Sequence, residues 1–257
     1  MRRLRLLRIQ DVTHLCKHLG SSPNELAHLC LKPEWYYRQG PRRIKGKTRH
    51  IATPQGRLRQ ILDRLQALLQ RVVLPESIHG GVKGHSPRTN AVVHLRKPVV
   101  LCMDIKDFFP SITNRRVYAM FRETLKCAPD VARILTRLCT LNGSLPQGSP
   151  TSTIVAALST VRLSNRLEQL ANRHIATYTQ YVDDVTISGP EHIDRMVPLL
   201  GEIIKQEGLR ANKAKTKIAR GGRGEVRHGH QSKHGPRCNV EEDEGSPSSS
   251  CVSRFFC

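Results

Sequence analysis

The sequence lacks a long hydrophobic run. None of its apolar stretches approaches the roughly 18 residues that a membrane-spanning helix needs. The apolar part of the opening MRRLRLLRIQ is short and no small-residue cleavage site follows it, which excludes a secretory signal peptide. These absences predict a cytoplasmic protein that has no membrane partner.

Paired cysteines and acidic residues are also scarce. The eight Cys show no Cys-x-x-Cys spacing, which excludes the usual zinc sites and disulfide frameworks. The 42 Lys and Arg outnumber the 21 Asp and Glu, which gives a formal charge of +21. This charge exceeds what solubility requires, so the expected partner is a polyanion, with nucleic acid as the first choice.

The hydrophobic residues follow regular patterns. They make up 38% of 257 residues, enough for one large core or two modest ones. Apolar residues at helical spacing predict an amphipathic helix over 58–73, and the basic segment before it, interrupted by Gly40 and Gly46, predicts a hairpin. The apolar run VVLCMDI predicts a buried strand over 99–105. Further helices are expected at 115–126, at 130–141, as one long helix over 154–170, and from 191 to 204.

Acidic side chains lie at the ends of predicted strands. Asp104 ends the strand over 99–105, and Asp183 and Asp184 lie between two strand-like runs that predict a hairpin. Two such carboxylate sites are what a two-metal phosphoryl-transfer centre needs, because they can hold two Mg²⁺ roughly 4 Å apart. A hairpin turn with solvated Asp is the alternative, and the Asp-Asp dipeptide alone favours it.

Longer motifs favour the catalytic interpretation. DIKDFFPSI at 104–112, LPQGSPTST at 145–153, YVDD at 181–184 and GLRANKAKTKI at 208–218 resemble the consecutive palm motifs of reverse transcriptases, in the same order. YRQGPRRIKGKTRHIATP resembles the fingers segment, and RTNAVVH carries the NAxxH signature of the bacterial retron type in Asn90, Ala91 and His94. The resemblance covers roughly residues 35 to 218.

This resemblance implies an α+β fold, in which a right-hand polymerase palm, an antiparallel sheet with packed helices, is joined to fingers. We expect an N-terminal helical region at 1–34, fingers at 35–98 and a palm with the catalytic site at 99–220. The implied activity is an RNA-directed DNA polymerase that extends a primer with dNTPs on a structured non-coding RNA, forming an RNA–DNA duplex. Such enzymes are generally implicated in defence against phage, and the sequence identifies no effector protein.

The resemblance also implies roles for individual residues. Asp104 and Asp183 would be the principal ligands of two Mg²⁺, and Asp184 would support the same site electrostatically. Lys215 falls where the family has a lysine that can protonate departing pyrophosphate, and a surface lysine is the competing interpretation. Tyr181 would lie beneath the primer end, or is simply a packed strand tyrosine.

Nucleotide-binding roles are implied for a second set of residues. Arg49, with Lys45 and Lys47, would bind the triphosphate. Phe109 would lie under the incoming sugar and select dNTPs by clashing with a 2′-hydroxyl. The remaining contacts with the incoming nucleotide are assigned to Gln147 and to the backbone amide of Asp107. Asn90 and His94 would orient structured RNA or merely fix a loop.

The C-terminal segment departs from the family pattern. From Gly221 onward, apolar periodicity is almost absent and Gly, Ser and charge are abundant, which predicts disorder. Neither a VTG motif nor a thumb domain follows residue 218. The possible codons of EVRHGH at 225–230, shifted forward by one nucleotide, can encode VTG, so we expect a frameshift that replaced the thumb. A catalytically inactive RNA-binding remnant, and reverse transcriptases of the group II intron or diversity-generating type, stay as alternatives.

Overall fold

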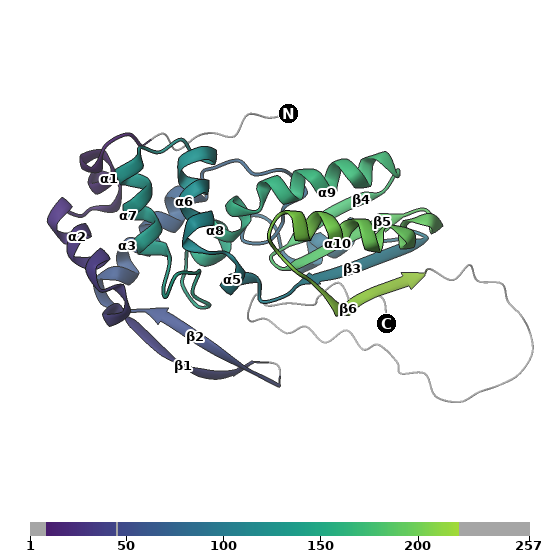
Figure 1. Ribbon diagram of the computed structural model, residues 1–257, viewed down its shortest axis with the longest axis horizontal. Helices are drawn as coiled ribbons and strands as arrows, with labels where there is room; N and C mark the ends of the chain where they lie inside the picture. The colour runs from purple at the N-terminus through teal and green to yellow at the C-terminus, as the bar shows by residue number, and fades with distance from the viewer. Residues whose placement is uncertain (1–8, 45, 221–257) are drawn as a thin grey trace, which may run out of the picture.

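A computed structural model describes residues 9–44 and 46–220 of the chain (Figure 1). Lys45, the side chain of Lys47 and the tail 221–257 lie outside this description, and so do the predicted disorder and frameshift of the tail. Within the described part, no helix is long and apolar enough to cross a membrane.

Helices form one end of the molecule (Figure 1). α1 (Val12–Leu19) and α2 (Pro23–Leu31) begin at side-chain caps, because Asp11 and Ser22 accept hydrogen bonds from the backbone of their first turns. α1 packs with α3 (Gly56–Leu69) and α7 (Pro129–Cys139), and α2 packs with α7. Of the leucines predicted to form one face of α3, Leu68 is half-buried and the others are buried, as expected from their spacing.

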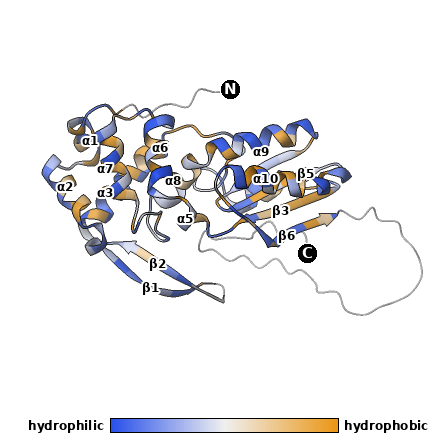
Figure 2. Ribbon diagram, in the orientation of Figure 1, coloured by the Kyte–Doolittle hydropathy of each residue, from blue (hydrophilic) through white to orange (hydrophobic). Residues whose placement is uncertain are grey.

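A basic hairpin projects from this helical end (Figure 1). It follows the short helix η1 (Pro33–Tyr36) and consists of β1 (Tyr37–Ile44) and β2 (Lys47–Pro54), which pair antiparallel with Arg42 opposite Arg49. Figure 2 shows that β1 is mainly hydrophilic, whereas the central strand β3 of the larger sheet is hydrophobic. The predicted hairpin is confirmed.

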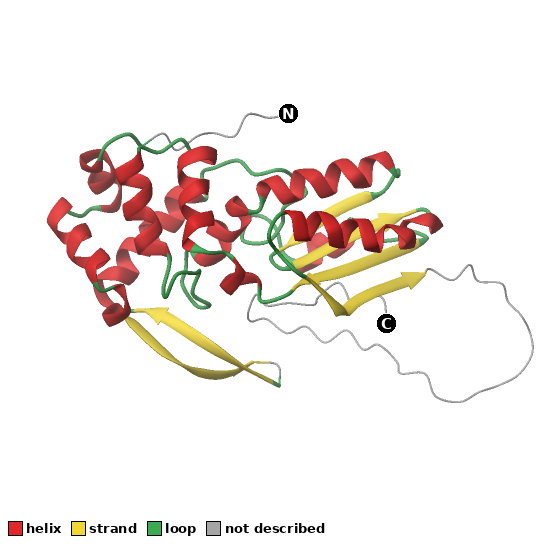
Figure 3. Cartoon of the chain, in the orientation of Figure 1, coloured by secondary structure: helices red, strands yellow, loops and turns green. Residues whose placement is uncertain are grey.

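The larger sheet has four antiparallel strands in the order β4-β5-β3-β6. These are β3 (Val99–Ile105), β4 (Thr177–Tyr181), β5 (Asp184–Gly189) and β6 (Ala211–Arg220). Two helices, α9 (Val161–Arg173) and α10 (Val197–Gln206), lie beside the sheet (Figure 3). Alternate residues of β3, among them Met103 and Ile105, belong to the main hydrophobic core, so the intervening Asp104 lies on the other face.

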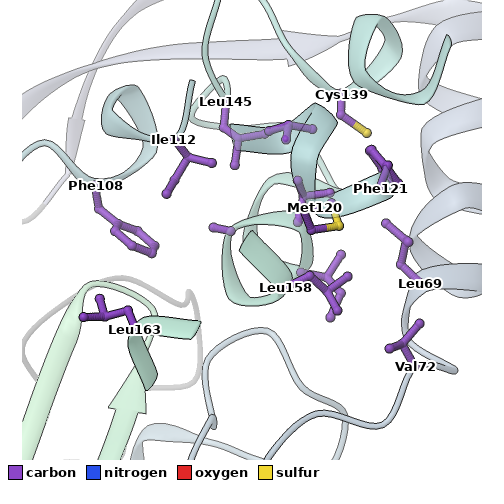
Figure 4. Close-up of a cluster of buried hydrophobic side chains, with 14 of the residues drawn as sticks. Leu69, Val72, Phe108, Ile112, Met120, Phe121, Cys139, Leu145, Leu158 and Leu163 are labelled. Atoms are coloured by element: carbon purple, nitrogen blue, oxygen red, sulfur yellow. The ribbon is translucent and has the colours of Figure 1, made fainter. Parts of the chain in front are cut away.

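Shorter helices connect these parts. They are α4 (Pro87–Val92), α5 (Phe108–Ser111), α6 (Asn114–Ala119), the π-turn Met120–Thr124, α8 (Ser152–Ser159) and the 3₁₀ helix η3 (Glu191–Met196). The close-up in Figure 4 shows Phe121, Leu158 and Leu69 packed together between these helices. One continuous core therefore runs from the helical end to the four-stranded sheet.

The prediction of one long helix over 154–170 is wrong. The chain forms α8 and α9, with Thr160 between them. The hydroxyl of Thr160 bonds back to the carbonyl oxygens of Ala156 and Ala157 at 3.0 and 3.2 Å, an arrangement that bends or interrupts helices. The same hydroxyl accepts a hydrogen bond from the buried side chain of Gln180 at 3.2 Å, so the interruption has a tertiary partner.

The predicted fold class is confirmed: antiparallel sheets pack with helices in a mixed α and β structure. The predicted strand over 99–105 has the bounds of β3, and the hairpin around Asp183 is formed by β4 and β5. The division into an N-terminal region, fingers and palm at residues 34 and 98 stays a prediction.

Candidate active site

Three carboxylates from two segments of the chain meet at one end of the four-stranded sheet. Antiparallel pairing of β3 with β5 places Asp104 opposite Asp184. Asp183 precedes β5 in the turn after β4, and its carbonyl oxygen accepts a hydrogen bond from the backbone of Ile105 at 2.9 Å. The sheet register therefore brings together residues that are about 80 positions apart in the sequence.

The carboxylate cluster is electrostatically unfavourable in the absence of cations. Burial, and then the neighbouring carboxylates of Asp184 and Asp104, raise the pKa of Asp183 to about 7. Lys215 acts in the opposite direction, but its effect is smaller. The cluster is consequently a place where a cation is attracted.

Strand β6 brings Lys215 to this cluster. The ammonium group of Lys215 forms an ion pair with the Asp104 carboxylate, and the side-chain amide of Asn212 donates to the same carboxylate at 3.3 Å. The register of β6 against β3 shifts between Cys102 and Asp104. The structure thus places Lys215 beside Asp104, although half of its side chain stays exposed.

A cavity connects the carboxylates with the basic hairpin. Its walls include most of the predicted site residues, namely Arg49, Asp104, Asp107, Phe109, Gln147, Asp183 and Lys215. Arg42, Arg43 and Arg59 add further positive charge to the same cavity. Asp184 is not part of the lining, and the positions of the Lys45 and Lys47 side chains are not described.

Local conformation positions the predicted nucleotide-contacting residues. Asp107 adopts a left-handed conformation with φ of 48° and precedes α5. Phe108 is buried, and its ring makes an edge contact with that of Phe109, with 5.6 Å between the ring centroids. Phe109 in turn lines the cavity five residues after Asp104.

The LPQG loop is attached to the base of the hairpin. The carbonyl oxygen of Gln147 accepts a hydrogen bond from the backbone of Ala52 at 2.8 Å. At Gly148, a Cβ atom would lie 2.7 Å from the Ile51 side chain, so only glycine permits this close approach. The loop and hairpin therefore form one continuous wall of the cavity.

Comparison with known proteins agrees with this geometry. The sequence profile of the family described as "Reverse transcriptase (RNA-dependent DNA polymerase)" matches residues 32–241. The chain belongs to the reverse transcriptase family. Similar proteins include the retron Se72 reverse transcriptase of Salmonella heidelberg, which is 32% identical over 182 residues, and the retron Mx65 reverse transcriptase of Myxococcus xanthus, which is 34% identical over 198 residues. The retron Ec86 reverse transcriptase of Escherichia coli is 34% identical over 181 residues.

These alignments cover 67%, 69% and 69% of this chain, respectively. They cover 47%, 46% and 54% of the respective relatives. The chain therefore spans about half the length of the curated relatives it matches.

Reverse transcriptases generally use divalent metal ions. Across residues 9–44 and 46–220, no three His, Cys, Asp or Glu side chains are arranged to hold a metal ion, and Asp104 is bound by Lys215 and Asn212. The donor chemistry nevertheless fits a hard divalent cation, because carboxylate oxygens are the preferred ligands of Mg²⁺. The raised pKa of Asp183 fits as well, since burial and then the neighbouring carboxylates disfavour the ionised form that a bound cation would favour.

A loop that sequence reasoning missed supports the turn that carries Val182 and Asp183. Ile78 forms a parallel bridge with Gln180, whose backbone donates to Ser77 at 2.7 Å and accepts from His79 at 2.8 Å. Gly80 then lies against Val182, where a Cβ atom would be only 2.1 Å from the backbone nitrogen. In the sequence, only the Gly80-Gly81 pair indicates that this loop approaches another segment closely.

The buried side chain of Gln180 also stabilises this turn. It is 1% exposed, donates to the carbonyl oxygen of Val182 at 3.1 Å, and accepts from the hydroxyl of Tyr178 at 3.2 Å. Val182 itself has a φ of 57°, which is uncommon for a β-branched residue. Gln180 and the loop 77–80 therefore fix the backbone from which the Asp183 side chain extends.

His94 of the NAxxH signature has a structural role. It is fully buried, and its two ring nitrogens lie 2.7 Å from the hydroxyl oxygens of Ser188 and Thr179. Burial is the main cause that lowers the pKa of His94 to about 4, so the imidazole is neutral at physiological pH. His94 thus links the segment after α4 to both β4 and β5.

Proposed function

We propose that this chain is an RNA-directed DNA polymerase of the retron type, which extends a primer with dNTPs on a structured non-coding RNA. The convergence of Asp104, Asp183 and Lys215 in a cavity with arginines on its wall, with Asp184 paired opposite Asp104 in the sheet, carries this proposal. The retron relatives and the NAxxH signature support the choice of template. A cytoplasmic location is part of the proposal, because RNA and dNTPs are both present there.

Asp104, Asp183 and Asp184 would hold two Mg²⁺. When bound, these ions favour ionisation of the primer 3′-hydroxyl and stabilise the charge of the leaving pyrophosphate. The proposed domains follow from this assignment: residues 99–220 form the palm that carries the carboxylates, and residues 35–98 form the fingers that close over the nucleotide.

The other cavity residues bind and orient the nucleotide. Arg49, with Lys45 and Lys47, neutralises the triphosphate in the proposal, and the backbone amide of Asp107 faces its phosphates. Gln147, which lines the same cavity, contacts the incoming nucleotide in the proposal.

Phe109 would select the incoming nucleotide, and Lys215 would assist the departure of pyrophosphate. An aromatic ring at Phe109 would leave no space for a 2′-hydroxyl, which selects dNTPs over NTPs. Lys215 would donate a proton to the departing pyrophosphate, and its ion pair with Asp104 keeps the ammonium close to the site of reaction.

Primer extension on an RNA template with dNTPs and Mg²⁺ tests the proposed activity. The unaltered chain is expected to synthesise DNA, and an Asp183→Asn, Asp184→Asn double variant to lose synthesis. RNA binding should persist in the variant, because the hairpin cations are unchanged. A folded, RNA-binding wild-type chain that synthesises no DNA would refute the proposal and favour the inactive remnant.

Metal binding can be measured without activity. Mg²⁺ at millimolar concentration should raise the thermal unfolding temperature of the unaltered chain, because a ligand that binds only the folded state stabilises it. The double variant should show no such increase. An equal increase in both proteins would place the bound metal somewhere other than at these carboxylates.

A further inference from the structure

A second basic pocket lies at the opposite end of the four-stranded sheet from the carboxylates. It is formed where β3 begins and β6 ends, on the side away from the basic hairpin (Figure 1). Val99 lies in this pocket, and Asp104 lies five residues further along the same strand. At the rise of an extended strand, the two sites are separated by roughly 17 Å.

Cations from three segments of the chain line this pocket. Arg96 and Lys97 precede β3, Arg195 belongs to η3, and Arg220 ends β6. Two carboxylates are also present, and one of them, Asp194, already pairs with Arg220 at 2.5 Å. The balance of charge in the pocket is therefore positive, which suits an anionic ligand.

The backbone that carries Arg96 and Lys97 is held in a fixed conformation. Arg96 has a φ of 58°, a left-handed conformation that a non-glycine residue adopts at a cost. Two residues before it, His94 is anchored to Ser188 and Thr179 by hydrogen bonds of 2.7 Å. The residue after Lys97 leads directly into β3. The backbone that carries the two cations is thus fixed before any ligand binds, which reduces the entropy lost on binding.

We propose that this pocket binds the phosphate backbone of the RNA partner at a point outside the reacting primer–template. Planar guanidinium groups suit phosphate oxygens because they donate two parallel hydrogen bonds. The choice of RNA, and not another polyanion, rests on the proposed function and on the formal charge of +21. Under this proposal, His94 positions an RNA contact that it does not itself make.

Charge reversal tests the proposal. The test variant is Arg96→Glu, Lys97→Glu in the full chain, and the matched control is Lys17→Glu, Arg133→Glu, which makes the same change in net charge on α1 and α7. Each is measured for binding of a hairpin RNA with a long single-stranded extension, over a range of salt concentrations, and for nucleotide incorporation on a short primer–template that does not reach the pocket.

The test variant is expected to bind the hairpin RNA about ten-fold more weakly than the control variant. Its slope of log affinity against log salt should fall by about two, one for each lost phosphate contact. Incorporation on the short primer–template should match that of the control. The milder variant Arg96→Gln, Lys97→Gln should give the same pattern with a smaller loss, which excludes an artefact of buried negative charge.

Equal RNA affinity in the test and control variants would overturn the proposal, as would a parallel loss of RNA binding and short-template activity. A loss that appears only with vesicles of anionic lipid, while RNA affinity is unchanged, would also overturn it. If the unaltered chain synthesises no DNA, the RNA-binding measurements still decide the role of the pocket, so the two proposals can fail separately.

Discussion

Replacing Gly80 with alanine tests whether the loop 77–80 positions the catalytic turn. The new Cβ atom would lie 2.1 Å from the backbone nitrogen of Val182 and 2.8 Å from its Cα. Ordinary contacts between such atoms are about 3.5–4.0 Å, so the two segments must separate by about 1.5 Å. Val182 immediately precedes Asp183, which means that this displacement acts directly on a proposed metal ligand.

The expected effect on catalysis is larger than the effect on stability. Overpacking of this kind costs about 1–3 kcal/mol of unfolding free energy. Misplacement of a catalytic group by about 1 Å costs about 100-fold in rate. Gly80→Ala should therefore stay folded, with a maximal incorporation rate about 100-fold lower and a smaller change in the KM for dNTP.

Single-nucleotide incorporation and thermal unfolding, measured on the same preparations, give the two quantities. Gly201→Ala is the matched control, because a Cβ at this position in α10 meets no atom within 4 Å. It should keep its rate, and its stability should rise by up to about 1 kcal/mol, because alanine favours a helix more than glycine does. A folded Gly80→Ala protein with an unaltered incorporation rate would refute the idea that the loop positions the turn. If the rate falls only in proportion to the folded fraction, Gly80 contributes to stability alone.

Two further predictions concern Lys215 and His94. Lys215→Arg should retain the ion pair with Asp104 but lower the maximal incorporation rate about 100-fold, because an arginine does not release its proton; a rate equal to that of the unaltered chain would limit Lys215 to binding. The pKa of His94, lowered to about 4, means that the unfolded state binds more protons below about pH 6.5, so stability is lost as pH falls through this window. Between pH 7 and pH 5, the free energy of unfolding in urea should fall by about 2 kcal/mol more in the unaltered chain than in His94→Asn. The contributions of His79, whose pKa is also lowered to about 4, and of Asp183, whose pKa is raised to about 7, are common to both proteins.

Much of the fold could be predicted from sequence because its patterns are local. β3 is an unbroken apolar run, and α3 has leucines at helical spacing, so both were predicted close to their observed bounds. β6 was missed because its sequence ANKAKTKIAR is rich in lysine and lies at an exposed edge, where pairing with β3 and not burial defines the strand. The break at Thr160 was missed because its partner Gln180 lies 20 residues away.

The residues of the candidate site were likewise predictable where the sequence has a local pattern, and not where the contact joins distant segments. Asp104 and Asp183 could be chosen because each ends or precedes a predictable strand, whereas the ion pair of Lys215 with Asp104 joins residues 111 positions apart and was expected only from the family resemblance. The contact of Gly80 with Val182 has no local signature at all, because a glycine required by close approach resembles a glycine in any turn.

Three of the acidic residues of this basic chain lie together at the end of the sheet, where they oppose stability. The pKa of Asp183, raised to about 7, lies above that of the unfolded chain, so the folded state binds more protons and loses stability as pH rises from about 4 to about 7. Lys215 offsets part of this repulsion through Asp104. Packing alone gives no reason to keep three carboxylates together at the end of a sheet. A bound cation reverses the penalty, because it favours the ionised carboxylates that burial disfavours. The site is therefore best understood as one that is strained without metal, which is why stabilisation by Mg²⁺ is the expected counterpart of its activity.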